Sequence, residues 1–339
     1  MPERSRRIAD FLTAAGWSHA EARALAGDAS FRRYHRVSQN GVRAVLMDAP
    51  PDREDVRPFV RMARHLLGLG LSAPSILASD EAAGLLLLED FGDETFTRLL
   101  RAGHDEAALY RLAIDVLVHL HRLEPAVALP PGLPAYDVPR LLDEALLFPD
   151  WYMPAIFGRP TEDGARREYA MAWEEVLTPD LGAPATLVLR DFHVDNLMRL
   201  SERDGIAACG LLDFQDAVAG PAAYDVMSLL EDARRDVPPS LKAEMLKSYY
   251  AGIGRADWTG FERAFAILAA QRHAKVIGIF TRLSRRDGKP SYLAHIPRVW
   301  RLLERALAHD ALAPLARWFD RHLPSWARVA PQPTNSTCI

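Results

Sequence analysis

Hydrophobic and polar positions change their period along the chain, and this change predicts where strands give way to helices. Before residue 91, apolar positions fall in short runs or alternate with polar ones, as in β-strands. After Thr95 they recur every three or four residues, as on one face of a helix. The sequence therefore predicts an α+β protein of two lobes: a small strand-rich N-lobe over residues 1–90 and a large helical C-lobe over residues 91–331. Residues 332–339 are polar and are predicted to be a disordered tail.

Five strands and two helices are predicted in the N-lobe. Asn40-Gly41 is a strong signal for a β-hairpin turn, and Gly84 to Asp90 is a nearly continuous apolar run, typical of a strand buried on both faces. The strands are expected as two within residues 25–37, joined by the turn 27–30, and three more at 42–47, 73–78 and 84–90. The helices are expected at 8–16 and 55–69, the second with Asp55 as its N-cap.

Seven main helices are predicted in the C-lobe. The clearest covers residues 105–123, and a proline-rich loop at 125–139 follows it. The other helices are expected at 140–147, 164–177, 225–235, 241–251, 258–283 and 296–307.

Composition narrows the class of protein. The chain has 339 residues, 49% of them hydrophobic, which is ample for two lobes with a shared cleft. The net charge is −4 with scattered Lys and Arg, so a nucleic-acid partner is not expected, and no obligate protein partner is evident. Two cysteines cannot form a disulfide framework, and no apolar run reaches the roughly 20 residues that span a bilayer. We expect a soluble protein of the cytoplasm.

Two motifs carry the chemistry. Asp191 and Asn196 follow a short apolar strand at 186–189, and Asp213 ends a second apolar run. Phosphoryl transfer from ATP uses such a set: one carboxylate orients and deprotonates the acceptor hydroxyl, while an amide oxygen and a second carboxylate hold Mg²⁺ on the phosphates. The alternative interpretation of Asp191 and Asn196 is a polar turn. The run Asp191-x-His193-x-Asp195 also resembles a metallohydrolase ligand set, but no second His-rich motif completes it.

These motifs resemble the aminoglycoside phosphotransferase family, which has a protein-kinase-like fold. The resemblance rests on Asp191-x-His193-x-x-Asn196, Leu212-Asp213-Phe214 and Gly220-Pro221-x-x-Tyr224-Asp225. It implies that Asp191 is the catalytic base and that Asn196 and Asp213 bind Mg²⁺. Arg190 stands where the family usually has a histidine. Asp225 is expected to be structural, either as an N-cap of the helix that follows or as an acceptor for backbone N–H groups of the catalytic loop.

A narrower resemblance is to the anomeric sugar kinases of peptidoglycan recycling, which phosphorylate the C1 hydroxyl of N-acetylmuramate and N-acetylglucosamine. It rests on three segments: Gly27-Asp28-Ala29-Ser30-Phe31-Arg32-Arg33-Tyr34, Met47-Asp48-Ala49-Pro50-Pro51 and Gln271-Arg272-His273-x-Lys275-Val276-x-Gly278. It implies that ATP, with Mg²⁺, phosphorylates a small sugar. Arg272 and His273, with His193 and Asp195 of the catalytic loop, are predicted to contact that sugar.

The nucleotide site departs from the kinase pattern. The third strand normally carries a lysine that pairs with the phosphates and with a helix glutamate, but residues 42–48 contain no lysine and the following helix has no interior glutamate. Ser30, Arg32, Arg33 and Arg43 are the candidate phosphate contacts, and strand alternation lets only one of Arg32 and Arg33 face the cleft. The hinge Leu88, Glu89, Asp90 and Phe91 is expected to meet the adenine through its backbone.

Two further functions stay open on the sequence alone. One is a kinase of another small molecule, such as an aminoglycoside, choline or homoserine. A cationic acceptor would need an acidic pocket, which Glu144, Asp150, Glu162 and Asp163 could supply. The other is a nucleotide-binding regulator without turnover, which the missing lysine suggests.

Overall fold

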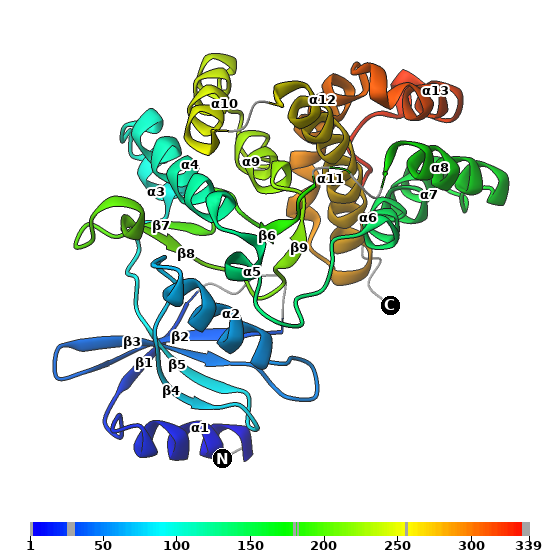
Figure 1. The fold of residues 1–339 in the computed structure, drawn as a ribbon. Helices are drawn as coiled ribbons and strands as arrows, with labels where there is room; N and C mark the ends of the chain where they lie inside the picture. Colours follow the sequence, from blue (N-terminus) through cyan, green and yellow to red (C-terminus); the bar gives the residue numbers. More distant parts are fainter. Residues whose placement is uncertain (1–2, 26–30, 179–180, 182, 255–256, 334–339) are drawn as a thin grey trace, which may run out of the picture. The chain divides into compact units, whose positions relative to one another are not determined.

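The computed structural model describes residues 3–25, 31–178, 181, 183–254 and 257–333 (Figure 1). The chain divides into two compact units. The first unit comprises residues 1–116 and 191–217, and the second comprises residues 117–190 and 218–339. The predicted lobe boundary at residue 90 stays a prediction.

The first unit is built on a five-stranded antiparallel sheet, in the order β1-β2-β3-β5-β4. The hairpin between β2 and β3 turns at Asn40 and Gly41, whose φ angles are 53° and 80°. Two consecutive positive φ values match the twist of a two-residue hairpin, so this sequence signal is confirmed. The strands are β1 (Glu21–Ala24), β2 (Arg33–Gln39), β3 (Val42–Asp48), β4 (Ile76–Asp80) and β5 (Leu85–Glu89).

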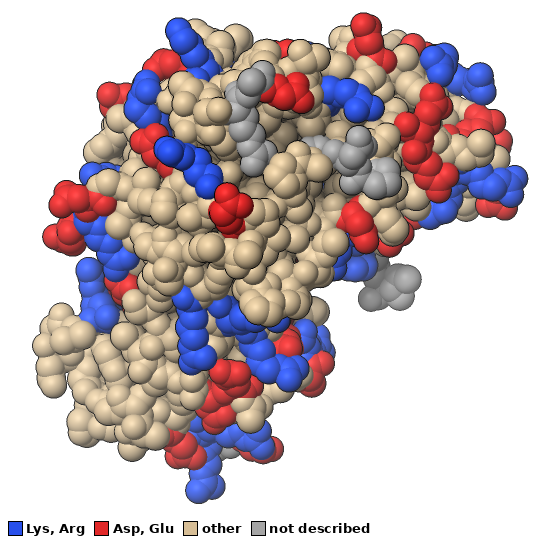
Figure 2. Space-filling model, viewed as in Figure 1, with Lys and Arg blue, Asp and Glu red and all other residues tan. Residues whose placement is uncertain are grey.

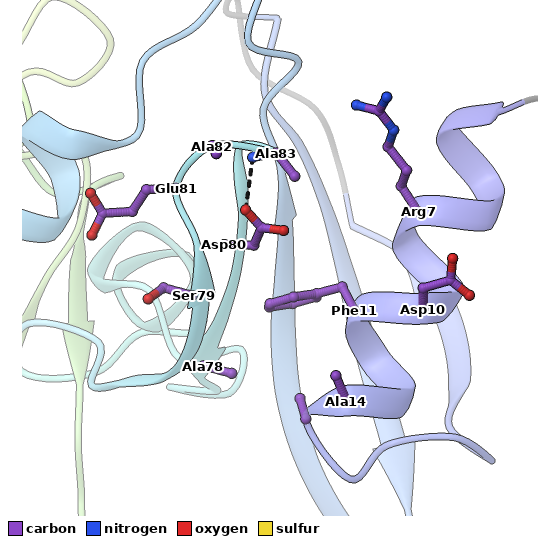
Figure 3. A pocket seen from close by; sticks show the side chains of 11 residues that line it. Arg7, Asp10, Phe11, Ala14, Ala78, Ser79, Asp80, Glu81, Ala82 and Ala83 are labelled. Atoms are coloured by element: carbon purple, nitrogen blue, oxygen red, sulfur yellow. Dashed lines mark hydrogen bonds between the residues drawn. The ribbon is translucent and has the colours of Figure 1, made fainter.

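The two faces of this sheet have different neighbours. Helix α1 (Glu3–Ala14) covers one face, where its Leu12 joins a buried cluster from β2, β3 and β5. Figure 3 shows a groove beside this helix, with Phe11 of α1 pointing toward strand β4. None of the predicted nucleotide- or metal-binding residues lines this groove. The opposite face of the sheet therefore carries the site.

Helix α2 (Arg57–Gly68) buries Phe59, Val60, Met62, Ala63 and Leu66, and the Phe59 ring stacks on Phe214 at 5.0 Å. This contact joins α2 to the segment that carries Asp213. The remaining elements of the first unit are α3 (Phe96–Arg101), the hairpin strands β7 (Leu197–Arg199) and β8 (Cys209–Leu211), and the short helix η2 (Gly205–Ala208). Helix α4 (Glu106–Arg122) runs from the first unit into the second.

The second unit is mainly helical, and the long helix α11 (Trp258–Asp287) is its centre (Figure 1). Eighteen of its residues are buried, among them Gln271, Arg272, His273 and Lys275. Other helices are α5 (Pro125–Ala128), α6 (Val138–Ala145), α7 (Met153–Phe157), α8 (Asp163–Val176), α9 (Ala223–Leu230), α10 (Pro239–Ile253), α12 (Ile296–Leu307) and α13 (Ala313–His322). Short helical turns are η1 (Phe148–Tyr152), η3 (Pro290–His295), η4 (Asp310–Leu312) and η5 (Ser325–Ala327), and strands β6 (Thr186–Val188) and β9 (Val218–Gly220) pair antiparallel.

Several predicted boundaries and caps are wrong. The first strand lies at 21–24, ahead of the predicted position, and the turn 27–30 lies outside the described residues. The N-cap of α2 is Val56, not Asp55, whose carboxylate instead accepts from the Arg57 N–H at 3.0 Å. The loop at 125–139 contains α5, and α9 begins at Ala223, so Asp225 lies inside the helix and is not its N-cap. The predicted tail lies mostly outside the described residues.

Two further observations concern the surface charges and the lengths of the helices. Figure 2 shows Lys and Arg intermixed with Asp and Glu on the visible face. Among the helices of the described ranges, none is long and apolar enough to cross a membrane.

Candidate active site

The backbone that leads into Asp191 is held in a left-handed conformation by a buried carboxylate. Arg190, one residue after Leu189 at the end of β6, has φ 69°, which is costly for a residue with a side chain. Asp225, fully buried in α9, accepts the Leu189 N–H at 2.6 Å and the Arg190 N–H at 2.9 Å. Of its two predicted structural roles, holding the catalytic loop is therefore the one that the structure supports.

Arg272 holds the same turn from α11. Its Nη1 donates to the Arg190 carbonyl at 2.9 Å and to the Tyr224 hydroxyl at 3.1 Å, and only 8% of the residue is exposed. In the turn before Asp191, the backbone N–H groups are thus bound by Asp225, and the Arg190 carbonyl is bound by Arg272. A direct contact of Arg272 with a substrate stays a prediction.

The Arg190 side chain lies in a buried ionic network. It pairs with Glu144, which also pairs with Lys275 at 2.9 Å and accepts from the Tyr136 hydroxyl at 2.5 Å. Burial alone would raise the pKa of Glu144, but Lys275 and Arg190 outweigh burial and lower it. Glu144, suggested above for an acidic pocket, is therefore neutralised by two cations of the chain.

Asp191, Asn196 and Asp213 come together in the first unit. The Asn196 amide Nδ2 donates to the Asp191 carbonyl at 3.0 Å and lies 3.5 Å from Asp213 Oδ2. Asp213 follows β8 with φ 57°, and its Oδ1 accepts from the Gln215 amide at 2.7 Å. The loop after β6 and the turn after β8 thus bring the Asn196 amide next to both the Asp191 backbone and the Asp213 carboxylate.

This donor set fits Mg²⁺. An Asp carboxylate and an Asn amide oxygen are hard oxygen ligands, and Mg²⁺ on a nucleotide takes only one or two protein oxygens together with phosphate oxygens. In the described ranges, no group of three or more His, Cys, Asp or Glu is arranged to hold a metal by itself. A two-residue set therefore suits a metal that arrives with phosphate better than it suits a self-sufficient hydrolase centre.

Arg32 is the arginine that lies beside this set. Its Nη1 is 3.9 Å from Asp213 Oδ1, and its Nε is 3.4 Å from Glu54 Oε2, with 13% of the side chain exposed. Arg33 is exposed, and the Arg43 side chain is 58% exposed with its Nε 3.8 Å from Asp90. Of the three candidates, only Arg32 is joined to the predicted metal ligands.

A cavity of about 350 Å³ lies under the sheet in the first unit. Tyr34 and Arg36 of β2, Val45 of β3 and Leu88 of β5 form its roof, since these residues alternate onto one face of the sheet. The full lining adds Leu25, Phe59, Pro74, Glu89, Asp90, Phe91, Gly92, Asp93, Thr95, Arg98, Met198, Leu212 and Asp213. The predicted hinge 88–91 and the predicted metal ligand Asp213 therefore line one cavity, consistent with a nucleotide.

Side chains of the hinge are committed to partners inside the protein. Asp90 pairs with Arg36 at 2.7 Å, and Glu89 pairs with Arg203. The Arg203 guanidinium also lies 5.3 Å from the Phe91 ring centroid. Recognition of a base by the backbone of this hinge stays a prediction.

The other predicted substrate contacts are divided between the units. His193 is buried beside Asn196, with its Nε2 3.5 Å from the amide, and Asp195 accepts a hydrogen bond from the Thr97 hydroxyl of α3. His273, in the second unit, pairs with Glu231 at 2.7 Å. Ser30 lies outside the described residues. Contact of His193, Asp195 and His273 with a sugar stays a prediction, as does the contact of Ser30 with phosphate.

Sequence reasoning missed Glu54, Arg36 and Glu231. Arg36 could have been found, because it lies four residues after Arg32 and so points to the same face of a strand. Glu54 and Glu231 carried no local signal, since each is defined by a partner more than twenty residues away.

Comparison with known proteins shows which proteins this chain resembles. Two curated relatives are both named N-acetylmuramate/N-acetylglucosamine kinase. The relative from Caulobacter vibrioides is 38% identical, covering 95% of this chain and 97% of its own length. The relative from Pseudomonas aeruginosa is 39% identical, covering 89% of each chain.

The fold is also that of known kinases. The GDP complex of aminoglycoside 2'-phosphotransferase-IIIa superposes with a TM-score of 0.62, at 16% identity, covering 90% of this chain and 99% of that one. The predicted kinase-like α+β fold is thereby confirmed. A family model, described as the phosphotransferase enzyme family, matches residues 21–261. With that match over more than half of its length, and with these relatives, the chain belongs to the phosphotransferase enzyme family.

Proposed function

We propose that this protein is an ATP-dependent kinase that phosphorylates the anomeric hydroxyl of N-acetylmuramate, N-acetylglucosamine or both. The observation that carries the proposal is the 38% identity, over 95% of the chain, to a relative named N-acetylmuramate/N-acetylglucosamine kinase. The grouping of Asp191, Asn196 and Asp213 next to a cavity under the sheet supports phosphoryl transfer. We place the reaction in the cytoplasm, where ATP is available.

In this proposal Asp191 orients the sugar hydroxyl and takes its proton. The hydroxyl oxygen then bonds to the γ-phosphorus of ATP, the bond to the β–γ bridging oxygen breaks, and ADP leaves. Asp225 and Arg272 keep the backbone before Asp191 from moving, so the carboxylate is held in position before the sugar arrives. Positioning and neutralisation of charge supply most of the catalysis.

Asn196 and Asp213 are the residues that would hold Mg²⁺, which supplies positive charge to the phosphate oxygens when it is bound. Arg32 adds a second positive charge beside Asp213, and Glu54 fixes the direction of its guanidinium. The proposed arrangement thus replaces the lysine–glutamate pair of other kinases with an arginine–glutamate pair.

The test is ATP consumption by the purified protein with Mg²⁺ and a panel of acceptors: N-acetylmuramate, N-acetylglucosamine, glucose, kanamycin, choline and homoserine. We expect turnover with the N-acetylated sugars, a sugar 1-phosphate that is stable to alkali and labile to acid, and a roughly 100-fold or greater loss of kcat in Asp191→Asn. Turnover with kanamycin, choline or homoserine alone would move the protein to another acceptor class. Nucleotide binding without turnover would favour a regulator.

A further inference from the structure

Helix α11 is locked to helix α6 by residues of the segment 271–278. The Gln271 amide donates to the Leu141 carbonyl of α6 at 2.9 Å. A Cβ atom at Gly278 would lie 2.5 Å from the backbone of Leu147, just after the end of α6, so only glycine lets the two segments approach this closely. Glu144, which lies between Leu141 and Leu147 along the chain, is therefore held in a fixed place against α11.

Glu144 lies between two cations and uses both of its carboxylate oxygens. Its Oε1 pairs with the Arg190 guanidinium. Its Oε2 pairs with Lys275 Nζ at 2.9 Å and also accepts from Gln271 Nε2 at 3.3 Å and from the Tyr136 hydroxyl. Burial raises the pKa of Tyr136, so this hydroxyl keeps its proton and donates. One oxygen of Glu144 thus binds Arg190, while the other ties the carboxylate to the rest of the second unit.

The Arg190 guanidinium is also held over an aromatic ring. Its Cζ lies 5.6 Å from the centroid of the Tyr136 ring. This tyrosine is itself fixed, because its N–H donates to the Ala219 carbonyl at 2.7 Å and a Cβ atom at Gly220 would lie 2.8 Å from the Tyr136 Cβ. The carboxylate of Glu144 and the ring of Tyr136 together therefore set the direction of the Arg190 side chain.

The direction of this side chain matters because Arg190 leads directly into Asp191. A residue with a side chain is strained at a φ of 69°, and such strain persists only where the surroundings hold the residue in place. Asp225 and Arg272 hold the backbone N–H and C=O groups of Arg190. The pairing with Glu144 adds a third anchor, on the side chain. Relaxation of Arg190 to an ordinary negative φ would turn the peptide group that leads to Asp191 and move its carboxylate.

We propose that Glu144 is a positioning residue for the catalytic base, because it holds, through Arg190, the strained turn that directs Asp191. The inference rests on the proposed kinase function and deepens it. It also assigns a role to the segment 271–278 of α11, in which Gln271 and Lys275 fix Glu144. In this role Glu144 touches neither nucleotide nor sugar, so its loss lowers kcat and leaves the KM values.

The kinetic test compares wild type, Glu144→Gln, Asp191→Asn and Glu144→Gln/Asp191→Asn, with ATP and the N-acetylated sugars. We expect Glu144→Gln to lower kcat roughly 10- to 100-fold, with the KM values for ATP and the sugar within about twofold of wild type. In the Asp191→Asn background the same change should cost little more, because no base is left to position. A loss by the same factor in both backgrounds would mean that Glu144 only supports the fold, and would overturn the inference.

Two further variants separate positioning from stability. Glu144→Gln leaves the buried Lys275 without its carboxylate, which destabilises the fold. Glu144→Gln/Lys275→Met also removes that charge, so it should recover melting temperature while kcat stays low, because Arg190 still lacks its carboxylate. Recovery of kcat together with the melting temperature would contradict the inference. Asp143→Asn is the matched control, since Asp143 is the exposed neighbour of Glu144 on α6, and it should change neither quantity.

Hydrogen exchange of the protein without ligands gives a readout that needs no turnover. The N–H groups of Leu189 and Arg190, which Asp225 binds, should exchange roughly 10-fold faster in Glu144→Gln than in wild type. Unchanged exchange at these two positions would overturn the inference. If wild type turns over none of the N-acetylated sugars, the proposed function falls, and this exchange still decides whether Glu144 holds the turn. If wild type does turn them over, the kinetic and the exchange results both have to hold.

Discussion

At the scale of single residues, Arg32 is the side chain that we propose in place of the usual kinase lysine. Burial tends to lower the pKa of its guanidinium, but Tyr34, Asp213 and Glu54 outweigh burial and raise the pKa. The residue therefore keeps its charge beside Asp213, a residue that lines the cavity under the sheet. A guanidinium can also meet phosphate oxygens with two parallel N–H groups.

Arg32→Ala should raise the KM for ATP roughly 10- to 100-fold, because a charge-assisted contact to the nucleotide is lost. The neighbouring Arg33→Ala is the matched control, since Arg33 is exposed on the other face of the strand. The KM of this variant for ATP should stay close to the wild-type value. Glu54→Gln should also raise the KM for ATP, but by less than Arg32→Ala does. Steady-state kinetics with ATP varied measure all three, and equal effects of the two arginine variants would contradict the assignment.

The sequence predicted the motif residues better than it predicted their partners. Asp191, Asn196 and Asp213 were predicted because their spacing along the chain is short and their residue types are specific to one chemistry. The choice among Arg32, Arg33 and Arg43 needed the structure, because strand alternation limits the options but does not say which face carries Asp213. Glu54 depends on where α2 begins, which the sequence predicted two residues too early.

At the scale of elements, the contact between α9 and α11 connects the catalytic turn to the helical core. Burial alone would raise the pKa of Glu231 above its usual 4.5, but His273 and Lys242 outweigh burial and lower it to about 2. Glu231 is therefore charged in the folded protein at pH values where an unfolded chain would already take up a proton. Since the unfolded state binds more protons there, the stability of this contact must fall as the solution becomes acidic.

The free energy of unfolding of wild type should therefore lose roughly 2–3 kcal/mol from Glu231 as the pH falls from about 5 to about 2, the interval between the unfolded and folded pKa values. Glu231→Gln should be less stable at pH 7 and should lack this part of the pH dependence. Lys242→Met should reduce this pH dependence in part, because one of the two groups that neutralise Glu231 is removed. Urea unfolding at a series of pH values tests this, and parallel curves for wild type and Glu231→Gln would disprove it.

Elements with a local signal were predicted well, and elements that depend on packing were not. The hairpin at Asn40-Gly41 and the helix at 296–307 appear where the sequence placed them. Asp225 looked like a helix cap because it follows a glycine-proline turn, yet the helix begins two residues earlier and the carboxylate is used on the catalytic turn. No sequence pattern distinguishes these two uses of the same residue.

At the scale of the whole molecule, the change from period two to period 3.6 predicted the α+β class, and the comparisons confirm it. The sequence could not predict that residues 191–217 group with the N-terminal sheet while residue 190 groups with the helices. That division follows from contacts between segments far apart in sequence, such as Phe59 with Phe214 and Ser72 with Ala207.

Nucleotide with Mg²⁺ should stabilise the protein as a whole. A ligand that binds only the folded state at 100 times its Kd adds about 2.7 kcal/mol, which we expect as a rise in melting temperature with ATP and Mg²⁺. EDTA should remove most of the rise, and Asn196→Ala should lose the Mg²⁺-dependent part. Asp191→Asn is the control, since it should lose turnover but keep the stabilisation. If Mg²⁺ does not change the melting temperature of wild type with ATP, the assignment of Asn196 and Asp213 as Mg²⁺ ligands is contradicted.

The buried Met47 on β3, fully enclosed where other kinases carry a lysine, has a consequence for chemical profiling. The first lysine of the chain is Lys242, so the described lining of the cavity under the sheet, our proposed nucleotide site, offers no primary amine. Activity-based probes that carry an acyl phosphate on a nucleotide label kinases by acylating that amine. Such a reagent would leave this protein unmarked even when the nucleotide part binds, so a proteome-wide survey made with it would miss this kinase.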